Sequence, residues 1–151
     1  MAASPGLSQR SLYQMIYHPS TGLCLQRCSL LGLDITLGPC IEDESWNYTP
    51  QGNIVLKGTI LCVEALGLGK VARLGMFCMG DNTQWSMMSD YKLHLSTKVE
   101  DITIVCLDGS SMPSVVTNKC NCLRRDSSCD PSSQWFKIIT TTKSLSLVSG
   151  I

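Results

Sequence analysis

The chain has 151 residues, of which 44% are apolar and 16% are charged, and its 12 basic and 12 acidic side chains give a net charge of zero. This length is typical of one domain with a buried core, and the balanced charge excludes the positive field of a nucleic-acid-binding protein. No apolar run is long enough for a membrane-spanning helix, so we expect neither a nucleic-acid nor a membrane partner.

Short strand-like segments separated by turn residues follow one another along the chain. Residues 13–17 and 23–25 are expected to form a hairpin around a turn at 18–22, and residues 53–57 and 59–63 a second one with Gly58 at its turn. Residues 91–95 alternate apolar and polar side chains, which is typical of a half-buried strand. Glycine and proline interrupt each apolar run before it reaches helical length, so the pattern predicts an all-β fold.

A pattern of two cysteines and a tryptophan recurs three times at a period of about forty residues. The three copies are Cys24, Cys40 and Trp46, then Cys62, Cys78 and Trp85, then Cys106, Cys120 and Trp135. The third copy is longer because of an insertion at residues 121–131. Three four-stranded repeats of this length suggest a closed β-trefoil, because closure leaves no exposed strand edge. A propeller of three blades would fall below the usual minimum of four.

The repeats set the expected domain boundaries. We place the trefoil at residues 11–145, with repeats at about 11–54, 55–95 and 96–143. Residues 1–10 are expected to be a disordered or linker segment, and residues 146–151 a C-terminal tail.

Nine cysteines favour either an oxidising compartment or a metal site. A zinc site needs clustered ligands, and the chain has no Cys-x-x-Cys pair and only two histidines, so we expect no metal. Pairing within each repeat predicts disulfides Cys24–Cys40, Cys62–Cys78 and Cys106–Cys120, with Cys122–Cys129 closing the insertion. Cys28 is then left as a free thiol or as a link to another domain or chain. The N-terminus shows no signal peptide, so we expect a piece of a longer secreted protein or a truncated gene product.

The repeated pattern Cys-Leu/Val-Asp/Glu/Gln, a second Cys and a Trp before a strand resembles the ricin B-type lectin repeat, from about Tyr13 to Lys143. Residues 15–24, 46–50, 93–97 and 133–137 further resemble the C-terminal ricin-type module of plant glycoside hydrolase family 5 proteins. The resemblance implies a monomeric carbohydrate-binding module without a cofactor. It also implies a glycan or plant cell-wall polysaccharide as partner, and a catalytic domain in the parent hydrolase.

The family's sugar contacts can be carried over residue by residue. The acid two residues after the leading cysteine corresponds to Gln26, Glu64 and Asp108. The amide three residues before the tryptophan corresponds to Asp43, Asn82 and Ser132, and the stacking aromatic two before the second cysteine to Gly38, Met76 and Asn118. No repeat holds the full set, so we expect weak binding, first by repeat three (Asp108, Asn118, Ser132) and second by repeat two (Glu64, Asn82). The alternative is that Asp108 only caps a turn with Gly109 and Ser110.

The three tryptophans are expected to be core residues whatever the function, because large aromatics spend most of their area in cores. The family's Gln-x-Trp is not kept, since Glu44, Thr83 and Ser133 precede the tryptophans by two positions. Asn47 begins an N-glycosylation sequon, although it lies at a strand start.

Three other functions remain as alternatives to the lectin. A glycosidase needs two carboxylates about 5–10 Å apart, and a barrel catalytic domain about 250 residues. We therefore expect no catalytic residues, and any hydrolase activity would belong to the parent enzyme. A protease-inhibiting trefoil of the Kunitz type lacks the threefold cysteine–tryptophan repeat. The third alternative is a structural trefoil that binds nothing.

Overall fold

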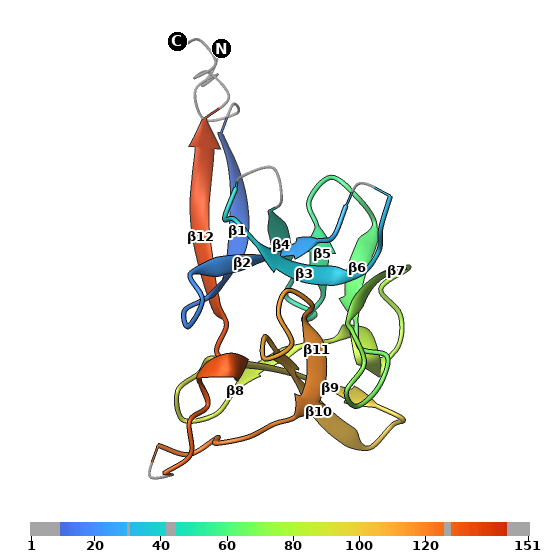
Figure 1. Ribbon diagram of the computed structural model, residues 1–151. Helices are drawn as coiled ribbons and strands as arrows, with labels where there is room; N and C mark the ends of the chain where they lie inside the picture. Colours follow the sequence, from blue (N-terminus) through green and yellow to red (C-terminus); the bar gives the residue numbers. More distant parts are fainter. Residues whose placement is uncertain (1–9, 30, 42–44, 126–127, 145–151) are drawn as a thin grey trace, which may run out of the picture.

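The computed structural model describes residues 10–29, 31–41, 45–125 and 128–144, which form twelve strands and the short 3-10 turns η2 and η3 (Figure 1). The all-β prediction is confirmed. Repeat one contributes β1 (Arg10–His18), β2 (Leu23–Arg27), β3 (Ile35–Gly38) and β4 (Trp46–Tyr48). Repeat two contributes β5 (Ile54–Leu56), β6 (Leu61–Glu64), β7 (Arg73–Met76), η2 (Asp81–Thr83) and β8 (Ser86–Met88). Repeat three contributes β9 (His94–Val99), β10 (Thr103–Asp108), β11 (Val116–Lys119), η3 (Ser132–Gln134) and β12 (Lys137–Ser144).

The predicted turns fall close to where the sequence placed them. Residues 18–22 join β1 to β2, and Gly58, with a φ of 82°, lies in the turn between β5 and β6. The strand expected at 91–95 begins only at His94, because Lys92 N–H bonds Ser89 O and Lys92 has a left-handed φ of 57°. The expected linker and tail fall almost wholly outside the described residues.

The strands form two sheets that nearly close on each other. One sheet has the order β3-β2-β1-β4-β5-β6-β7 with β12 on β1, and the other has the order β11-β10-β9-β8. β1 and β12 form a long antiparallel ribbon that joins the first repeat to the last (Figure 1). Backbone hydrogen bonds also link segments of different sheets. Trp85 N–H, just before β8, donates to Gly52 O, and Phe136 N–H, just before β12, donates to Leu93 O, both at 2.8 Å.

The three repeats meet in a ring of backbone hydrogen bonds. Ile35 N–H donates to Ala72 O (2.9 Å), Ala72 N–H to Val115 O (2.9 Å), and Val115 N–H to Ile35 O (3.1 Å). All three residues are fully buried. Three further bonds between repeats join Leu37 to Pro113, Leu74 to Leu33, and Thr117 to Lys70. One residue of each repeat therefore occupies an equivalent position around a common centre.

The core contains one large aromatic side chain from each repeat, but the third is not Trp135. Trp46 and Trp85 are buried, and their indole N–H groups donate to Leu25 O (3.0 Å) and Val63 O (2.9 Å). In repeat three the fully buried ring belongs to Phe136.

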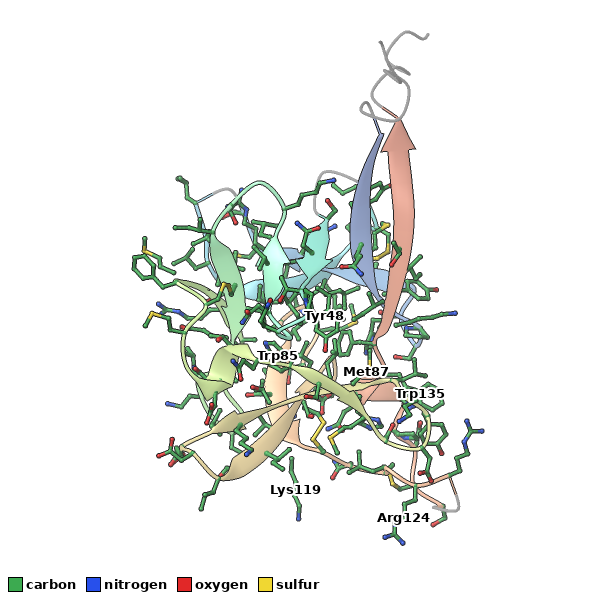
Figure 2. The ribbon with its side chains drawn as sticks, turned by 180° about the vertical axis from the view of Figure 1, so that it is seen from behind. Tyr48, Trp85, Met87, Lys119, Arg124 and Trp135 are labelled. Atoms are coloured by element: carbon green, nitrogen blue, oxygen red, sulfur yellow. A yellow bond between two sulfur atoms is a disulfide. The ribbon has the colours of Figure 1, made fainter. Side chains whose placement is uncertain are left out.

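The expectation that Trp135 is a core residue is therefore wrong. Trp135 is only partly buried, and Figure 2 shows it nearer the edge of the molecule than Trp85. The reason is the position of the 3-10 turn: η2 ends two residues before Trp85, and η3 ends two residues before Phe136. Phe136 therefore takes the core position in repeat three that Trp85 takes in repeat two, and Trp135 lies outside the core.

The four predicted disulfides are confirmed. Cys24–Cys40, Cys62–Cys78 and Cys106–Cys120 close loops of 16, 16 and 14 residues, and Cys122–Cys129 closes a loop of 7. Cys28 is a free, exposed thiol. Within the described residues, no helix has the length and apolar character needed to cross a membrane.

Candidate sugar-binding sites

Asp108 ends β10 and is almost completely buried, with 4% of its surface exposed. Its Oδ1 accepts a hydrogen bond from Ser110 N–H (2.8 Å). Its Oδ2 accepts hydrogen bonds from Asn118 Nδ2 and Gln134 Nε2, both 3.1 Å. The structure therefore brings together two of the three residues expected for repeat three, Asp108 and Asn118, and adds Gln134.

These hydrogen bonds decide the charge state of the Asp108 carboxyl. Burial acts to raise its pKa, but the bonds from Asn118, Gln134 and Ser110 outweigh burial and hold the pKa below its usual value. The side chain is thus an ionised group whose two oxygens already have protein donors. The bond from Ser110 is the turn cap that the sequence offered as the alternative to sugar contact.

In repeat three, the residue three before the core aromatic lies one position later than the carry-over from the family pattern placed it. Gly109 N–H donates to Ser133 O (2.8 Å), just as Ala65 N–H donates to Asn82 O (3.0 Å) in repeat two. Ser133, rather than Ser132, is therefore the counterpart of Asn82. Ser132 instead donates its backbone N–H to Asp130 Oδ1 (2.9 Å) in the turn before η3.

Gln134 is the residue that the sequence reasoning missed. Its side chain is 1% exposed and bridges Asp108 Oδ2, Lys119 O (2.9 Å) and Asn121 N–H (2.9 Å). The signal was present, because Gln134 and Phe136 form the family's Gln-x-aromatic pattern with phenylalanine in place of tryptophan.

Glu64 in repeat two lies over the backbone of Gly75, where an added Cβ would come within 2.3 Å of its carboxylate. It approaches Arg73 at 3.9 Å, an exposed pair of little energetic weight. Gly75 pairs with Cys62 as Asn118 pairs with Cys106, so Gly75 and not Met76 occupies the place given to the stacking aromatic. Met76 is 63% exposed and lies one position further along the hairpin.

At the sugar-contact positions of repeat one that the structure describes, no acid or amide is open. Gln26 Nε2 donates to Pro39 O, and its side chain covers Gly38. The amide position of this repeat, Asp43, lies outside the described residues.

A pocket of about 280 Å³ opens beside Asn82, and we call it the repeat-two pocket. Its lining includes Ala65, Leu66 and Asn82, together with Glu100 and Asp101 in the turn after β9. Asn82 is held in place by a hydrogen bond from its Nδ2 to Ala65 O (2.9 Å). A lining that combines apolar side chains with a few polar groups is usual for a small-molecule site.

The two histidines are structural. His18 and His94 are buried, and each ring pairs with a backbone carbonyl, Ser133 O (2.8 Å) and Asn121 O (3.0 Å) respectively. Burial lowers the pKa of His94 despite its bond to Asn121, so the ring is neutral near pH 7. In the described ranges, no group of three or more His, Cys, Asp or Glu side chains is placed to hold a metal ion. Asn47, the sequon residue, is exposed on β4.

Comparison with known proteins gives one informative match. No protein-family model matches the chain. The chain is 40% identical to a "Glycosyl hydrolase 5 family protein" of Chamaecyparis obtusa, over 93% of this chain and 27% of that protein. The chain is thus similar, along nearly its whole length, to about a quarter of a glycosyl hydrolase 5 family protein.

Proposed function

We propose that this chain is a non-catalytic, glycan-binding module with a ricin B-type β-trefoil fold, accessory to a secreted glycoside hydrolase of family 5. The main support for this proposal is the unequal coverage of the sequence match, which includes 93% of this chain but only 27% of the relative. A region of that size that is all-β and has its own core is a separable folding unit. The rest of such a relative is long enough for a catalytic barrel, which needs about 250 residues.

One feature of the structure supports the trefoil and another supports secretion. The ring of bonds through Ile35, Ala72 and Val115 relates the three repeats in an equivalent way. Four disulfides fit an oxidising, extracellular setting. The partners that follow are a plant cell-wall polysaccharide and the catalytic domain of the parent enzyme, with the module itself a monomer.

We place the first glycan site in the repeat-two pocket, ahead of repeat three. Asp108 is ionised and buried, and protein donors bond both of its oxygens, so little of it faces a ligand. Asn82 lines an open pocket together with exposed carboxylates. Weak binding at this site is sufficient for an accessory module, because tethering raises the local concentration of the enzyme on its polysaccharide.

The test is a plant-polysaccharide array probed with the purified chain and with Asn82→Ala. The exposed amide of Asn47 on β4 supplies the control variant, Asn47→Ala. We expect binding to neutral polysaccharide that Asn82→Ala weakens by about fivefold, the worth of one hydrogen bond, and that Asn47→Ala leaves unchanged.

Two results would contradict the proposal. Absence of array signal for the wild-type chain would remove glycan binding. Release of reducing sugars by the isolated chain would make it an enzyme. Because Asn82 also bonds Ala65 O, the near-ultraviolet circular dichroism of Asn82→Ala must match that of the wild type before its binding is interpreted.

A further inference from the structure

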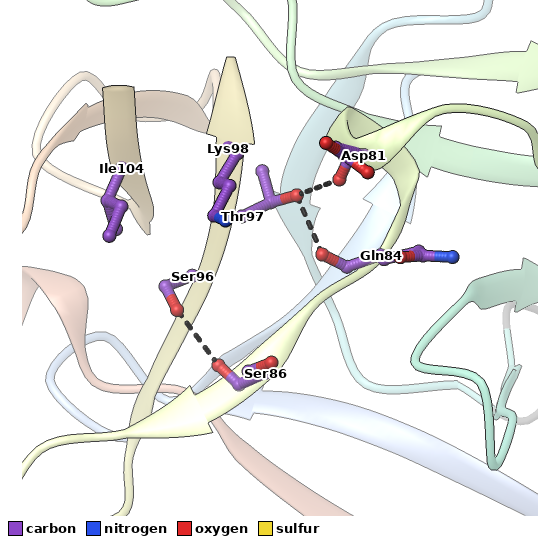
Figure 3. Close-up of a pocket in the computed structure, with 7 residues that line it drawn as sticks. All are labelled: Asp81, Gln84, Ser86, Ser96, Thr97, Lys98 and Ile104. Carbon is purple, nitrogen blue, oxygen red and sulfur yellow. Dashed lines mark hydrogen bonds between the residues drawn. The ribbon is translucent and has the colours of Figure 1, made fainter. Parts of the chain in front are cut away.

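A second pocket lies where repeat two meets repeat three, and we call it the border pocket (Figure 3). Its volume is about 290 Å³, and it lies between η2, β8, β9 and the start of β10. Its lining includes Asp81, Gln84, Ser86, Ser96, Lys98 and Ile104. None of these residues occupies a position that the ricin B-type pattern assigns to sugar contact.

The floor of the border pocket is built from buried hydroxyl groups. The Thr97 hydroxyl is 2.7 Å from both Asp81 O and Gln84 O, and only 4% of the residue is exposed. Ser96, 7% exposed, donates to Ser86 O at 3.3 Å. These bonds, drawn in Figure 3, fasten η2 and β8 to β9. The pocket is therefore preformed, and a ligand need not order it.

The border pocket lies beside the repeat-two pocket, because Asp81 and Lys98 line both. Small-molecule sites usually have volumes of about 300–1,000 Å³. Each pocket alone, at about 290 and 280 Å³, falls just below that range, whereas the two joined fall within it. The size therefore suits a ligand that is longer than either pocket.

The side chains of the joined pockets suit a chain of sugars. Gln84 and Ser86 are exposed and line the border pocket, so an amide and a hydroxyl are available at its edge. Ile104, 48% exposed, offers an apolar surface to sugar C–H groups. Lys98 makes no ion pair with any described residue, so its ammonium group is free to donate.

The net charge of the residues that line the two pockets favours neutral sugars over acidic ones. Asp81, Glu100 and Asp101 supply three carboxylates against the single positive charge of Lys98. Like charges repel across a binding site, so a chain of uronic acids is disfavoured. A neutral chain meets no such cost.

From this geometry we infer that the two pockets form one continuous groove that binds a neutral oligosaccharide of at least two sugar units. One unit lies in the repeat-two pocket, and the next crosses Asp81 and Lys98 into the border pocket. This inference rests on the proposed glycan binding and adds to it a second subsite, a chain-length requirement and a charge preference.

Calorimetric titration of the whole chain tests the length requirement. The probes are xylose, mannose and glucose oligomers from monosaccharide to hexasaccharide, with galacturonic acid oligomers of the same lengths. We expect the affinity for neutral oligomers to rise about tenfold or more from monosaccharide to trisaccharide, since the second subsite adds one or two hydrogen bonds. Galacturonic acid oligomers should bind at least about tenfold more weakly.

A blocking variant tests the location. Ser86→Tyr fills the border pocket, and Asn47→Tyr is its matched control, because Asn47 follows Trp46 on β4 as Ser86 follows Trp85 on β8. We expect Ser86→Tyr to bind the hexasaccharide only as tightly as the monosaccharide, and Asn47→Tyr to behave as the wild type. Gln84→Ala should weaken hexasaccharide binding about fivefold, with exposed Gln51→Ala as its control.

The outcomes separate the two proposals. Binding of no glycan at any length overturns both. Binding that is independent of length, insensitive to Ser86→Tyr, or equally strong for galacturonic acid oligomers overturns the continuous groove but leaves glycan binding in place.

Discussion

At the residue scale, Asp108 is a charged side chain held inside the fold by its neighbours. Its carboxylate accepts bonds from Ser110, Asn118 and Gln134, and Gly109 beside it packs so tightly on His18 that an added Cβ would come within 2.7 Å of the ring. The network joins β10, β11 and η3 of repeat three. The main role of Asp108 is therefore structural, because its carboxylate is already bonded by protein donors.

Replacement of Asp108 should destabilise the protein in a pH-dependent way. Asp108→Asn is expected to lower the free energy of unfolding by about 1–3 kcal/mol near neutral pH, because a buried donor is left unpaired. The folded-state pKa of Asp108 is lowered, so its contribution is complete above the unfolded pKa of about 3.9 and is lost as the pH falls through the folded value.

Urea unfolding of both proteins from pH 7 to pH 2 measures this effect. The stability gap between wild type and Asp108→Asn should be constant above about pH 5 and shrink below about pH 4. A gap that stays constant down to pH 2 would mean that the hydrogen bonds do not depend on the charge of Asp108.

The outward turn of Trp135 gives a second test at this scale. Its indole N–H is buried with no hydrogen-bond partner, whereas the N–H of Trp85 bonds Val63 O. Trp135→Phe removes an unpaired donor and should leave the melting temperature unchanged or higher. Trp85→Phe leaves a carbonyl unpaired and opens a cavity, and should cost about 1–3 kcal/mol. Equal losses in the two variants, measured by calorimetry, would show that Trp135 is a core residue after all.

At the scale of elements, the insertion of repeat three is anchored on the turn before β9. Arg125 N–H donates to Asp90 Oδ2 (3.0 Å), and the Arg125 guanidinium lies 5.3 Å from the Tyr91 ring centroid. Tyr91 also contacts Trp135, at 5.1 Å between ring centroids. The tryptophan displaced from the core thus packs against the turn that holds the insertion.

The disulfides should contribute according to the loops they close. Removal of Cys106–Cys120, a loop of 14 residues, as the double serine variant should cost about 3 kcal/mol through the unfolded state. Removal of Cys122–Cys129, a loop of 7 residues, should cost no more than about 2.5 kcal/mol. Denaturant unfolding of the two double variants checks the order, and a reversed order would show that the insertion is more deeply coupled to the core than its place at the edge suggests.

At the scale of the whole molecule, the ring of Ile35, Ala72 and Val115 makes each repeat depend on the other two. No repeat can complete its backbone bonds alone, because each of these N–H groups is satisfied by the next repeat. A fold closed in this way opens as one cooperative unit.

Native-state hydrogen exchange followed by NMR tests that cooperativity. The amides of Ile35, Ala72 and Val115 should exchange slowest and at one common rate, set by global unfolding. The amide of Gly52, which bonds Thr49 O within a surface turn, should exchange faster. A large difference in rate among the three ring amides would show that one repeat opens independently.

The all-β class, the repeat of about forty residues, the four disulfides and two of the three core aromatics could be predicted from the sequence. These features depend on short sequence patterns that recur along the chain. The two cysteines of each disulfide lie no more than 16 residues apart. Because the same cysteine spacing recurs in all three repeats, the disulfide pairing within each repeat could be predicted even where one copy is irregular.

Other features could not be predicted from the sequence: Phe136 replaces Trp135 in the core, Gly75 pairs with Cys62, and Gln134 bonds the buried Asp108. The tertiary fold also brings Asp81 and Lys98, from neighbouring repeats, into the lining of the same two pockets. The physical reason is that an insertion or a single extra residue shifts the register of every later position. That shift becomes visible only through contacts between segments far apart in the chain.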